Sequence, residues 1–177
     1  MSNTESISLR ALEPEDIELL YDWENNREFW RISNTQLPFS KYILEKYIEN
    51  SHLDIYQSKQ LRMMIDLNTD SSTRTIGCVD LFDFDPFHAR AGVGILIANS
   101  ADRNLGYAAK ALNEIIDYTF NYLQLHQLYC NITSENTASL KLFEGSGFSI
   151  IGTKKDWIKD NNGYIDEMIL QLINPAT

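Results

Sequence analysis

The chain has 177 residues, 44% of them hydrophobic, which is enough for one globular domain with a sizeable core. Its formal net charge of −10 argues against a nucleic-acid partner, because phosphate contacts need basic patches; the charge suits a cationic small-molecule partner, or it only keeps the protein soluble. There is no apolar run of membrane-spanning length and no signal-peptide pattern at the start, so we expect a single cytoplasmic domain over residues 1–177 without a membrane partner.

The first half of the chain predicts one strand, two helices and three strands. The first strand covers 7–12, and Pro14 with acidic neighbours begins the first helix. Ser40 is the expected N-cap of a second helix over 40–51, with one face formed by Ile43, Leu44, Tyr47 and Ile48. Between the helices, we expect the aromatic segment 27–39 to be irregular. The three strands that follow cover 61–67, 75–85 and 90–98.

The second half predicts two helices that alternate with strands. The first helix runs over about 105–123, and its buried stripe contains Leu105, Ala108, Leu112, Ile115, Ile116 and Phe120. A strand at 125–133, a short helix within 135–148 and a closing hairpin over 149–173 follow. This order predicts a mixed α/β sheet with a parallel contact in its middle.

Cysteine and histidine usage gives no sign of a metal site. Cys78 and Cys130 both lie in strand-like runs, where reduced core cysteines are expected. The three histidines are scattered and belong to no cluster with metal-ligand spacing.

A small-residue turn before the 105–123 helix suggests an anion site. The first turn of a helix has free N–H groups and a positive dipole end, and Gly106 and Ala108 would let an anion approach this backbone. Neither a P-loop nor a dinucleotide-binding glycine pattern occurs in the right context. The pattern Arg103-x-x-Gly106-x-Ala108 remains, and by itself it fits an ordinary helix start with a glycine in the turn equally well.

A second run, "ENTASLKLFEGSGF" (135–148), resembles the N-x-x-[AS]-x-x-[LY]-[YF]-E-x-x-GF pattern of the GNAT superfamily of N-acetyltransferases. The Arg103–Gly106–Ala108 turn is similar to the [QR]-x-x-G-x-[GA] loop of the same family. The resemblance covers nearly the whole chain, and "GCVDLFDFDPFHARAG" looks like the spermidine and ribosomal-protein N-acetyltransferase branches. It implies a mostly antiparallel central sheet with a splayed parallel strand pair, flanked by about four helices.

The resemblance implies that acetyl-CoA is the co-substrate and that no metal is needed. Backbone N–H groups of residues 103–108 would hold its pyrophosphate, and the residues concerned are Arg103, Asn104, Leu105, Gly106, Tyr107 and Ala108. The pantetheine arm would pair with the strand backbone near Ile95, Leu96 and Ile97. Asn136 matches an asparagine that contacts the same arm, and it also suits a helix N-cap. Ser139 and Phe143, which follow in the same run, complete the residues that the resemblance implies for cofactor binding.

The implied reaction is direct acetyl transfer from a thioester to an amine. An aliphatic amine with a pKa near ~10.4 must lose a proton at pH 7, which costs about 4.6 kcal/mol at ~1.36 kcal/mol per pKa unit, so a base is the greater need. The leaving thiolate resembles cysteine, with a pKa near ~8.5, and protonating it helps by roughly 100-fold. The strand backbone near Ile97 could supply N–H donors to the oxyanion.

This chain departs from the family pattern at two places. Many relatives carry a proton-donating tyrosine where Phe143 stands, and some carry an acidic residue where Gly92 or Gly94 stands. Ser139, Tyr107 and Tyr129 are the replacement acids we consider, although each also suits a purely structural role. Both departures concern catalysis and leave the cofactor assignment unaffected.

Asp80 is the first candidate for the base. It lies in the middle of a predicted strand, where apolar neighbours would raise the pKa of a carboxyl group. Alternation places it on one strand face with Phe82 and Phe84, while Val79, Leu81 and Asp83 lie on the other; a solvent-facing strand residue is the competing interpretation. Asp83 and Asp85 are weaker candidates and suit the surface.

The acceptor is expected to be a small-molecule amine such as a polyamine, or a protein N-terminus. Its site would be shaped by aromatic side chains near carboxylates such as Glu24. The aromatic residues concerned are Tyr21, Trp23, Phe29, Trp30, Trp157 and Tyr164. The alternative is that these aromatics fill the core, which we favour for Trp23 and Trp30. The competing function is a non-catalytic acyl-CoA sensor or scaffold, which Phe143 and Gly92 favour. Relatives are often dimers or larger, so a homo-oligomer is compatible with the resemblance.

Overall fold

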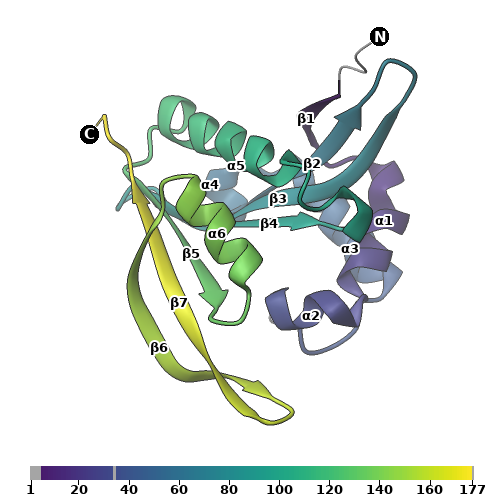
Figure 1. Cartoon of the computed structure of the whole chain (residues 1–177). Coiled ribbons are helices and arrows are strands. Elements are labelled where there is room, and N and C mark those ends of the chain that lie inside the picture. The colour runs from purple at the N-terminus through teal and green to yellow at the C-terminus, as the bar shows by residue number, and fades with distance from the viewer. Residues whose placement is uncertain (1–4, 34, 177) are drawn as a thin grey trace.

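One seven-stranded sheet organises the chain. The computed structural model describes residues 5–33 and 35–176. The strand order is β1-β2-β3-β4-β5-β7-β6, and every neighbouring pair is antiparallel except the parallel pair β4–β5 (Figure 1). The expected mixed sheet with a central parallel contact is therefore confirmed. The strands are β1 (Ser6–Ala11), β2 (Leu61–Asn68), β3 (Thr73–Asp85), β4 (Arg90–Ile97), β5 (Gln127–Thr133), β6 (Ser149–Asp160) and β7 (Gly163–Ile173).

Six α-helices, rather than about four, flank the sheet in the part of the chain that the structure describes. They are α1 (Ile17–Glu24), α2 (Arg27–Ser33), α3 (Lys41–Glu49), α4 (Ile55–Ser58), α5 (Tyr107–Asp117) and α6 (Thr137–Gly145). None of these described helices is long and apolar enough to cross a membrane. The Ser40 side chain accepts the N–H of Ile43 and caps α3, as expected.

Two short helices were missed by the sequence analysis. The segment 27–39 is not wholly irregular, because α2 occupies its first seven residues, and α4 lies in the connection before β2. Neither helix is long enough for a hydrophobic period to repeat. The signal that α2 does carry is a cap: the N–H of Glu28 donates to the side chain of Asn26 at 3.0 Å.

Two other helices differ from the prediction, one in its first residue and both in their buried faces. The long helix begins at Tyr107 rather than 105, because Asn104 and Gly106 have φ values of 62° and 85° and so interrupt the helical backbone. Leu105 is consequently 57% exposed and does not belong to the buried stripe. In α3, Ile43 is 51% exposed, so the buried face is narrower than predicted. A π-helical turn, η4 (Tyr118–Tyr122), extends α5.

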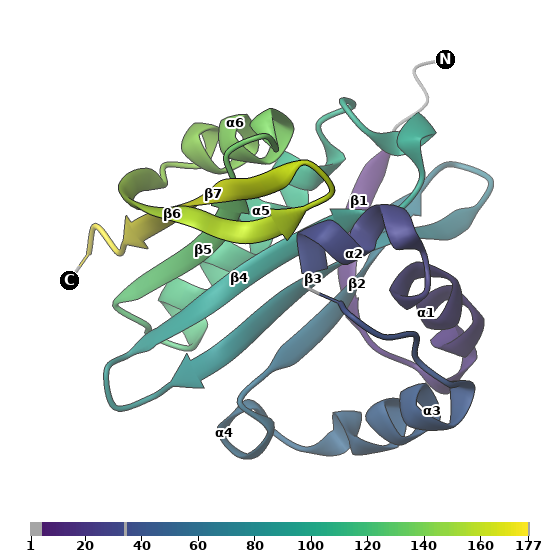
Figure 2. The same cartoon turned by 90° about the horizontal axis from the view of Figure 1, so that it is seen from below.

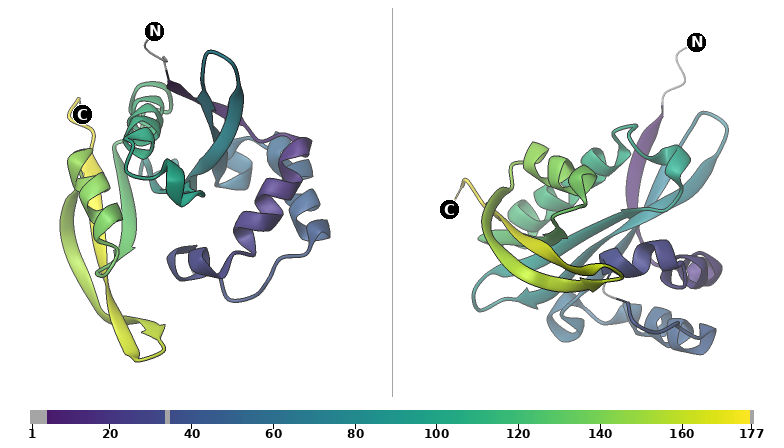
Figure 3. Two further views of the ribbon diagram at one scale, coloured as in Figure 1. Left: turned by 45° about the vertical axis from the view of Figure 1, so that its right-hand side comes forward. Right: turned by 60° about the horizontal axis from the view of Figure 1, so that its bottom comes forward.

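The sheet separates two apolar layers. Helices α5 and α6 cover one face, and α1 and α3 cover the other (Figures 1 and 3). Strand β3 contributes to both layers, since Val79 and Leu81 pack under α5 while Cys78 packs under α1 and α3. Phe84 lies with Val79 and Leu81, not with Asp80 as expected. The reason is a bulge: the β3–β4 register shifts after Phe82, and Asp83 adopts a φ of 49°.

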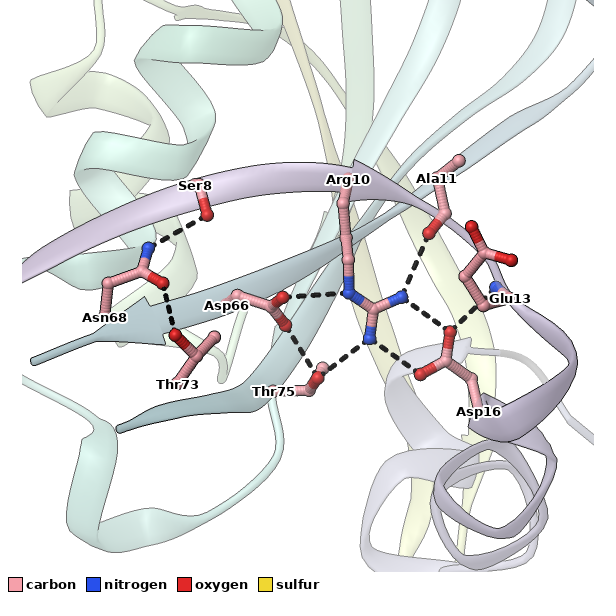
Figure 4. A network of polar contacts seen from close by, with 9 residues as sticks. All are labelled: Ser8, Arg10, Ala11, Glu13, Asp16, Asp66, Asn68, Thr73 and Thr75. Carbon is pink, nitrogen blue, oxygen red and sulfur yellow. Dashed lines mark hydrogen bonds and ion pairs between the residues drawn. The ribbon is translucent and has the colours of Figure 1, made fainter. Parts of the chain in front are cut away.

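Arg10 fastens the start of α1 to the sheet (Figure 4). Its guanidinium donates to Asp66 on β2 at 2.8 Å and to both oxygens of Asp16 at 2.7 Å. Asp16 lies in η1 (Pro14–Asp16), the 3-10 turn that leads into α1, and it also accepts the N–H of Glu13 at 2.9 Å. Thr75 on β3 completes the network by accepting from Arg10 and donating to Asp66. Three strands and one helix start are therefore joined at a single side chain.

Candidate active site

Strands β4 and β5 part after a short paired segment. Residues 90–92 pair with residues 127–129, and the pairing ends there. We call residues 93–97 the unpaired edge of β4. The N–H of Ala98 donates to Ile76 on the β3 side, and successive backbone groups of a strand point to opposite edges, so the N–H groups of Ile95 and Ile97 point away from β3. The expected splayed parallel pair is confirmed.

The three residues expected to pair with a pantetheine arm do not all face the same way. Ile95 and Ile97 direct their backbone groups toward the unpaired edge. Leu96 directs its own toward β3, opposite Cys78, and its side chain packs with the α1–α3 layer. An extended chain added at this edge would therefore use Ile95 and Ile97.

The loop between β4 and α5 has free backbone N–H groups at the end of the unpaired edge. The first N–H groups of a helix have no acceptor within it, and those of residues 104–108 have no partner among the residues that the structure describes. The N–H of Arg103 differs, because it donates to Ser100 at 3.2 Å. Backbone N–H groups without an acceptor, which the sequence predicts over 103–108, are thus present over 104–108.

Two side-chain contacts hold this loop in place. Arg74 on β3 donates to buried Asp102 at 2.8 Å, and this hydrogen bond holds the pKa of Asp102 below its usual range. Tyr107, the first residue of α5, buries its ring and donates its hydroxyl to Glu5 before β1. The loop is therefore pinned at both ends.

The side chain of Arg103 also holds this loop in place, through contacts with β4 and α2. Its Nε donates to the carbonyl of Ile97 at 3.0 Å, and another nitrogen donates to the carbonyl of Ala98 at 2.9 Å. The guanidinium lies 5.7 Å from the ring centroid of Phe29 on α2. Arg103 thereby connects the loop before α5 to β4 and to α2.

Gly106 provides a direct test of the loop. A Cβ at this position would meet no atom within 4 Å, so its φ of 85°, and not a lack of space, favours glycine. Alanine costs about 1–2 kcal/mol in this conformation. We expect Gly106→Ala to raise KM for acetyl-CoA about 10-fold, measured by steady-state kinetics. Gly145→Ala is the matched control, since that position has equal space and no positive φ. Equal KM values for the two variants would contradict the prediction.

The start of α6 lies beyond β5. The side chain of Asn136 accepts the N–H of Ser139 at 3.1 Å, which makes Asn136 the N-cap. Phe143 lies one turn after Ser139 and is only 3% exposed, with its ring 5.0 Å from that of Phe148 in an edge-to-face contact. Phe143 has no proton to donate and belongs to the core. The half-buried hydroxyl of Ser139 shares its helix face.

The two tyrosines considered as acids are engaged elsewhere. The Tyr107 hydroxyl donates to Glu5, and the Tyr129 hydroxyl donates to Asp83 at 3.1 Å. Burial and the Asp83 carboxylate raise the pKa of Tyr129 to about 12. A group with such a pKa is a weak proton donor, which favours the structural role for Tyr129.

Asp80 lies opposite Gly94 in the β3–β4 ladder, within a charged cluster. Both of its carboxylate oxygens accept from Arg62, at 2.7 and 3.1 Å, and Arg62 also donates to Glu24 of α1 at 2.6 Å. Burial alone would lower the pKa of Arg62, but Asp80 holds it above its usual value. The expectation of purely apolar neighbours around Asp80 was wrong, because the adjacent strand β2 supplies a guanidinium.

Asp83 and Asp85 have surface roles, as expected. Asp83 is exposed and accepts from Tyr129. Asp85 accepts the N–H of His88 at 3.0 Å and pairs with Arg90 at 3.2 Å, and the hydrogen bond from His88 holds the pKa of Asp85 below its usual range. These contacts shape the β3–β4 turn.

The two glycines on β4 leave different amounts of space. A Cβ at Gly92 would lie 2.2 Å from the ring of Phe82, which itself packs edge-to-face on Tyr129. At Gly94 the nearest atom would be 3.8 Å away. A side chain at position 92 would therefore require the Phe82 ring to move, whereas one at position 94 would not.

A cleft of about 670 Å³ lies between α2 and the β6–β7 hairpin, which approach each other in Figure 2. Its lining residues are Arg27, Trp30, Arg31, Thr35, Gln36, Trp157, Ile158 and Lys159. Trp30 lines this cleft instead of filling the core, with its indole N–H donating to the carbonyl of Glu24 at 2.8 Å. Trp23 packs in the α1–α3 layer with Tyr21, and Phe29 is buried; Tyr164 is 63% exposed and does not line the cleft.

Sequence reasoning missed the basic residues of this cleft. Arg27 and Arg31 are four residues apart on α2, so they share a helix face, and Lys159 reaches the cleft from β6. The i, i+4 spacing in "REFWRIS" is the signal that could have found the first two. No group of three side chains with metal-ligand chemistry gathers within residues 5–33 and 35–176.

Known proteins resemble this chain in sequence and in fold. The sequence model of the family described as Acetyltransferase (GNAT) domain matches residues 6–149. The spermidine N(1)-acetyltransferase of Vibrio cholerae is 28% identical over 145 residues, covering 80% of this chain and 78% of that protein. The Escherichia coli K12 enzyme of the same name is 26% identical over 152 residues, covering 86% and 77%.

Solved structures agree with these matches. The crystal structure of Vibrio cholerae spermidine N-acetyltransferase in complex with CoA and spermine superposes with a TM-score of 0.83 at 26% identity, covering 94% of this chain and 95% of that one. A structure of the spermidine N-acetyltransferase from the same species, described as dodecameric, has a TM-score of 0.76 at 28% identity and covers 94% and 93%.

Proposed function

The chain belongs to the GNAT acetyltransferase family, and we propose that it transfers the acetyl group of acetyl-CoA to the primary amine of a small molecule. The observation that carries this proposal is the unpaired edge of β4, which ends at the free N–H groups before α5. An extended thiol arm and a diphosphate need these two features side by side. Ile95 and Ile97 would hold the arm, residues 104–108 the pyrophosphate, and Asn136 the far side of the arm.

Acetyl-CoA supplies a thioester whose C–S bond breaks as the C–N bond of the amide forms. The acceptor ammonium must first lose one proton to free the lone pair that attacks, and the nitrogen loses a second proton as the amide forms. One of these two protons is returned to the leaving thiolate and the other is released to solvent. We assign the removal of the first proton to Asp80, whose carboxylate position is fixed by Arg62 while lone pairs remain for an amine or a bridging water. Ser139, one turn before Phe143, is the assigned proton donor to the thiolate.

The relatives indicate which acceptors to test first. The relatives named above are spermidine N-acetyltransferases, which makes polyamines the first class to test, and a protein N-terminus is the alternative. One relative is described as dodecameric, so we also propose a homo-oligomer. The buried, unpaired Cys78 and Cys130 suit a reducing compartment, and we propose the cytoplasm.

A non-catalytic acyl-CoA-binding protein is the second candidate, favoured by the buried Phe143 at the tyrosine position. Two measurements separate the candidates. CoA at 100 times its dissociation constant should stabilise the fold by about 2.7 kcal/mol, visible as a rise in Tm. Thiol release from acetyl-CoA over a panel of polyamines, amino acids and peptide N-termini then reports turnover. A raised Tm without release from any amine would support the binding protein; an unchanged Tm would contradict both candidates.

A further inference from the structure

The cleft between α2 and β6 is basic, although the whole chain is strongly acidic. Arg27, Arg31 and Lys159 line it, and no Asp or Glu does. Arg27 and Arg31 share one face of α2, while Lys159 comes from the opposite wall. Because the whole chain has a net charge of −10, three cationic side chains around one cleft suggest a function for that cleft.

The charges of this cleft are only partly neutralised. Arg31 pairs with Asp160 at 3.0 Å and with Glu135 at 3.7 Å. Arg27 and Lys159 make no ion pair with any residue in the described part of the chain, whereas most Lys and Arg side chains outside the cleft do. Both side chains are exposed on the walls of the cleft, so an anion bound there would give each of them an opposite charge.

Two aromatic walls accompany these cations. Trp30 is held by its hydrogen bond to the Glu24 carbonyl, with the Arg27 guanidinium 5.8 Å from its ring centroid. Trp157 lies on the β6 side and is 57% exposed. The cleft of about 670 Å³ thus combines two indole side chains with three cationic side chains.

The cleft adjoins the proposed transfer site. Arg31 reaches Glu135, the residue directly before the Asn136 cap of α6. Phe29, on the same helix, contacts Arg103 of the loop before α5. Helix α2 therefore contacts both the loop before α5 and the residue before the cap of α6, and it also forms one wall of the basic cleft.

We propose that the acceptor is an anionic amine: a small primary amine that also carries a carboxylate or phosphate group, bound between Arg27 and Lys159 with its carbon skeleton against Trp30 and Trp157. This inference rests on the proposed acetyl transfer and replaces the polyamines named above with an anionic amine as the acceptor class. A polyamine has only cationic groups and would meet like charges in this cleft.

Matched acceptor pairs test the proposal by acetyl-CoA-dependent thiol release. Leucine against leucinamide isolates a carboxylate, and phosphoethanolamine against ethanolamine isolates a phosphate; spermidine represents the polyamines. In at least one pair, we expect the member that carries the anionic group to have a kcat/KM about 10-fold or more above that of the partner that lacks it and of spermidine, because hydrogen bonds to charged groups are worth about 1.5–3 kcal/mol. The pair that shows the preference identifies whether the cleft binds a carboxylate or a phosphate group.

The double variant Arg27→Gln, Lys159→Gln should abolish that preference by raising KM for the anionic acceptor about 10-fold, with KM for acetyl-CoA unchanged. Lys155→Gln is the matched control, since Lys155 is exposed on the same strand and pairs with Asp166 instead of lining the cleft. Efficient release with spermidine that the double variant does not weaken would overturn this inference and leave acetyl transfer intact. If none of the amines causes thiol release, the acetyl transfer on which this inference rests is overturned.

Discussion

Replacing Asp80 with Asn is expected to lower kcat by at least about 100-fold, while KM for acetyl-CoA stays within about twofold. The amide keeps the shape of the side chain and still accepts one hydrogen bond from Arg62, but it cannot take a proton from the acceptor ammonium. The reaction then depends on the small fraction of amine that is neutral in solution. Steady-state kinetics with a saturating acceptor measures the effect.

Two controls separate catalysis from folding for this variant. Asp83→Asn lies on the same strand, is exposed and contacts Tyr129, so it should change kcat little. Glu24→Gln removes the other carboxylate from Arg62 and reports the cost of disturbing the ion cluster without removing the assigned base. If Glu24→Gln lowers kcat as much as Asp80→Asn, the cluster is structural and the base lies elsewhere.

Replacing Arg10 with Met is expected to lower the free energy of unfolding by about 2–3 kcal/mol near pH 7. Removing one partner of a fully buried ion pair costs about 3–5 kcal/mol, and we lower this value because the Arg10 side chain is 32% exposed. Asp16 and Asp66 would remain as carboxylates at 5% and 11% exposure without their cation (Figure 4). Urea unfolding monitored by tryptophan fluorescence measures the difference.

The pH dependence of that difference provides an independent check. Burial raises the pKa of Asp16, but the hydrogen bonds from Arg10 and from the Glu13 backbone outweigh it and hold the pKa below the ordinary 3.8. This contribution to stability is therefore present above about pH 4 and is lost as the pH falls through the lower, folded-state value.

Without Arg10, burial would raise the pKa of Asp16, and the penalty of the variant should shrink as the pH falls from 7 to 3. Lys46→Met is the control, because its pair with Glu49 is exposed and should change stability by no more than about 0.5 kcal/mol at either pH. A penalty for Arg10→Met that stays constant over this pH range would contradict the role given to the ion pair.

Local patterns predicted most of the fold. Strand alternation, the Ser40 cap and the closing hairpin depend on residues that are near one another in the chain, and the structure confirms them. Errors arose where local patterns are too short or are interrupted. Helix α2 is too short to show a period, and the bulge at Asp83 moved Phe84 to the other face of β3.

The sequence by itself determined the family and the position of the loop with free N–H groups, because the geometry of this loop follows from Gly106 and the helix start beside it. The tertiary structure alone decided the surroundings of Asp80 and the charge of the cleft between α2 and β6. Arg62 reaches Asp80 across a strand pairing, and Lys159 meets Arg27 across a cleft between distant segments. Electrostatic interactions depend on distance in space, which chain order does not specify until the sheet and its helices have assembled.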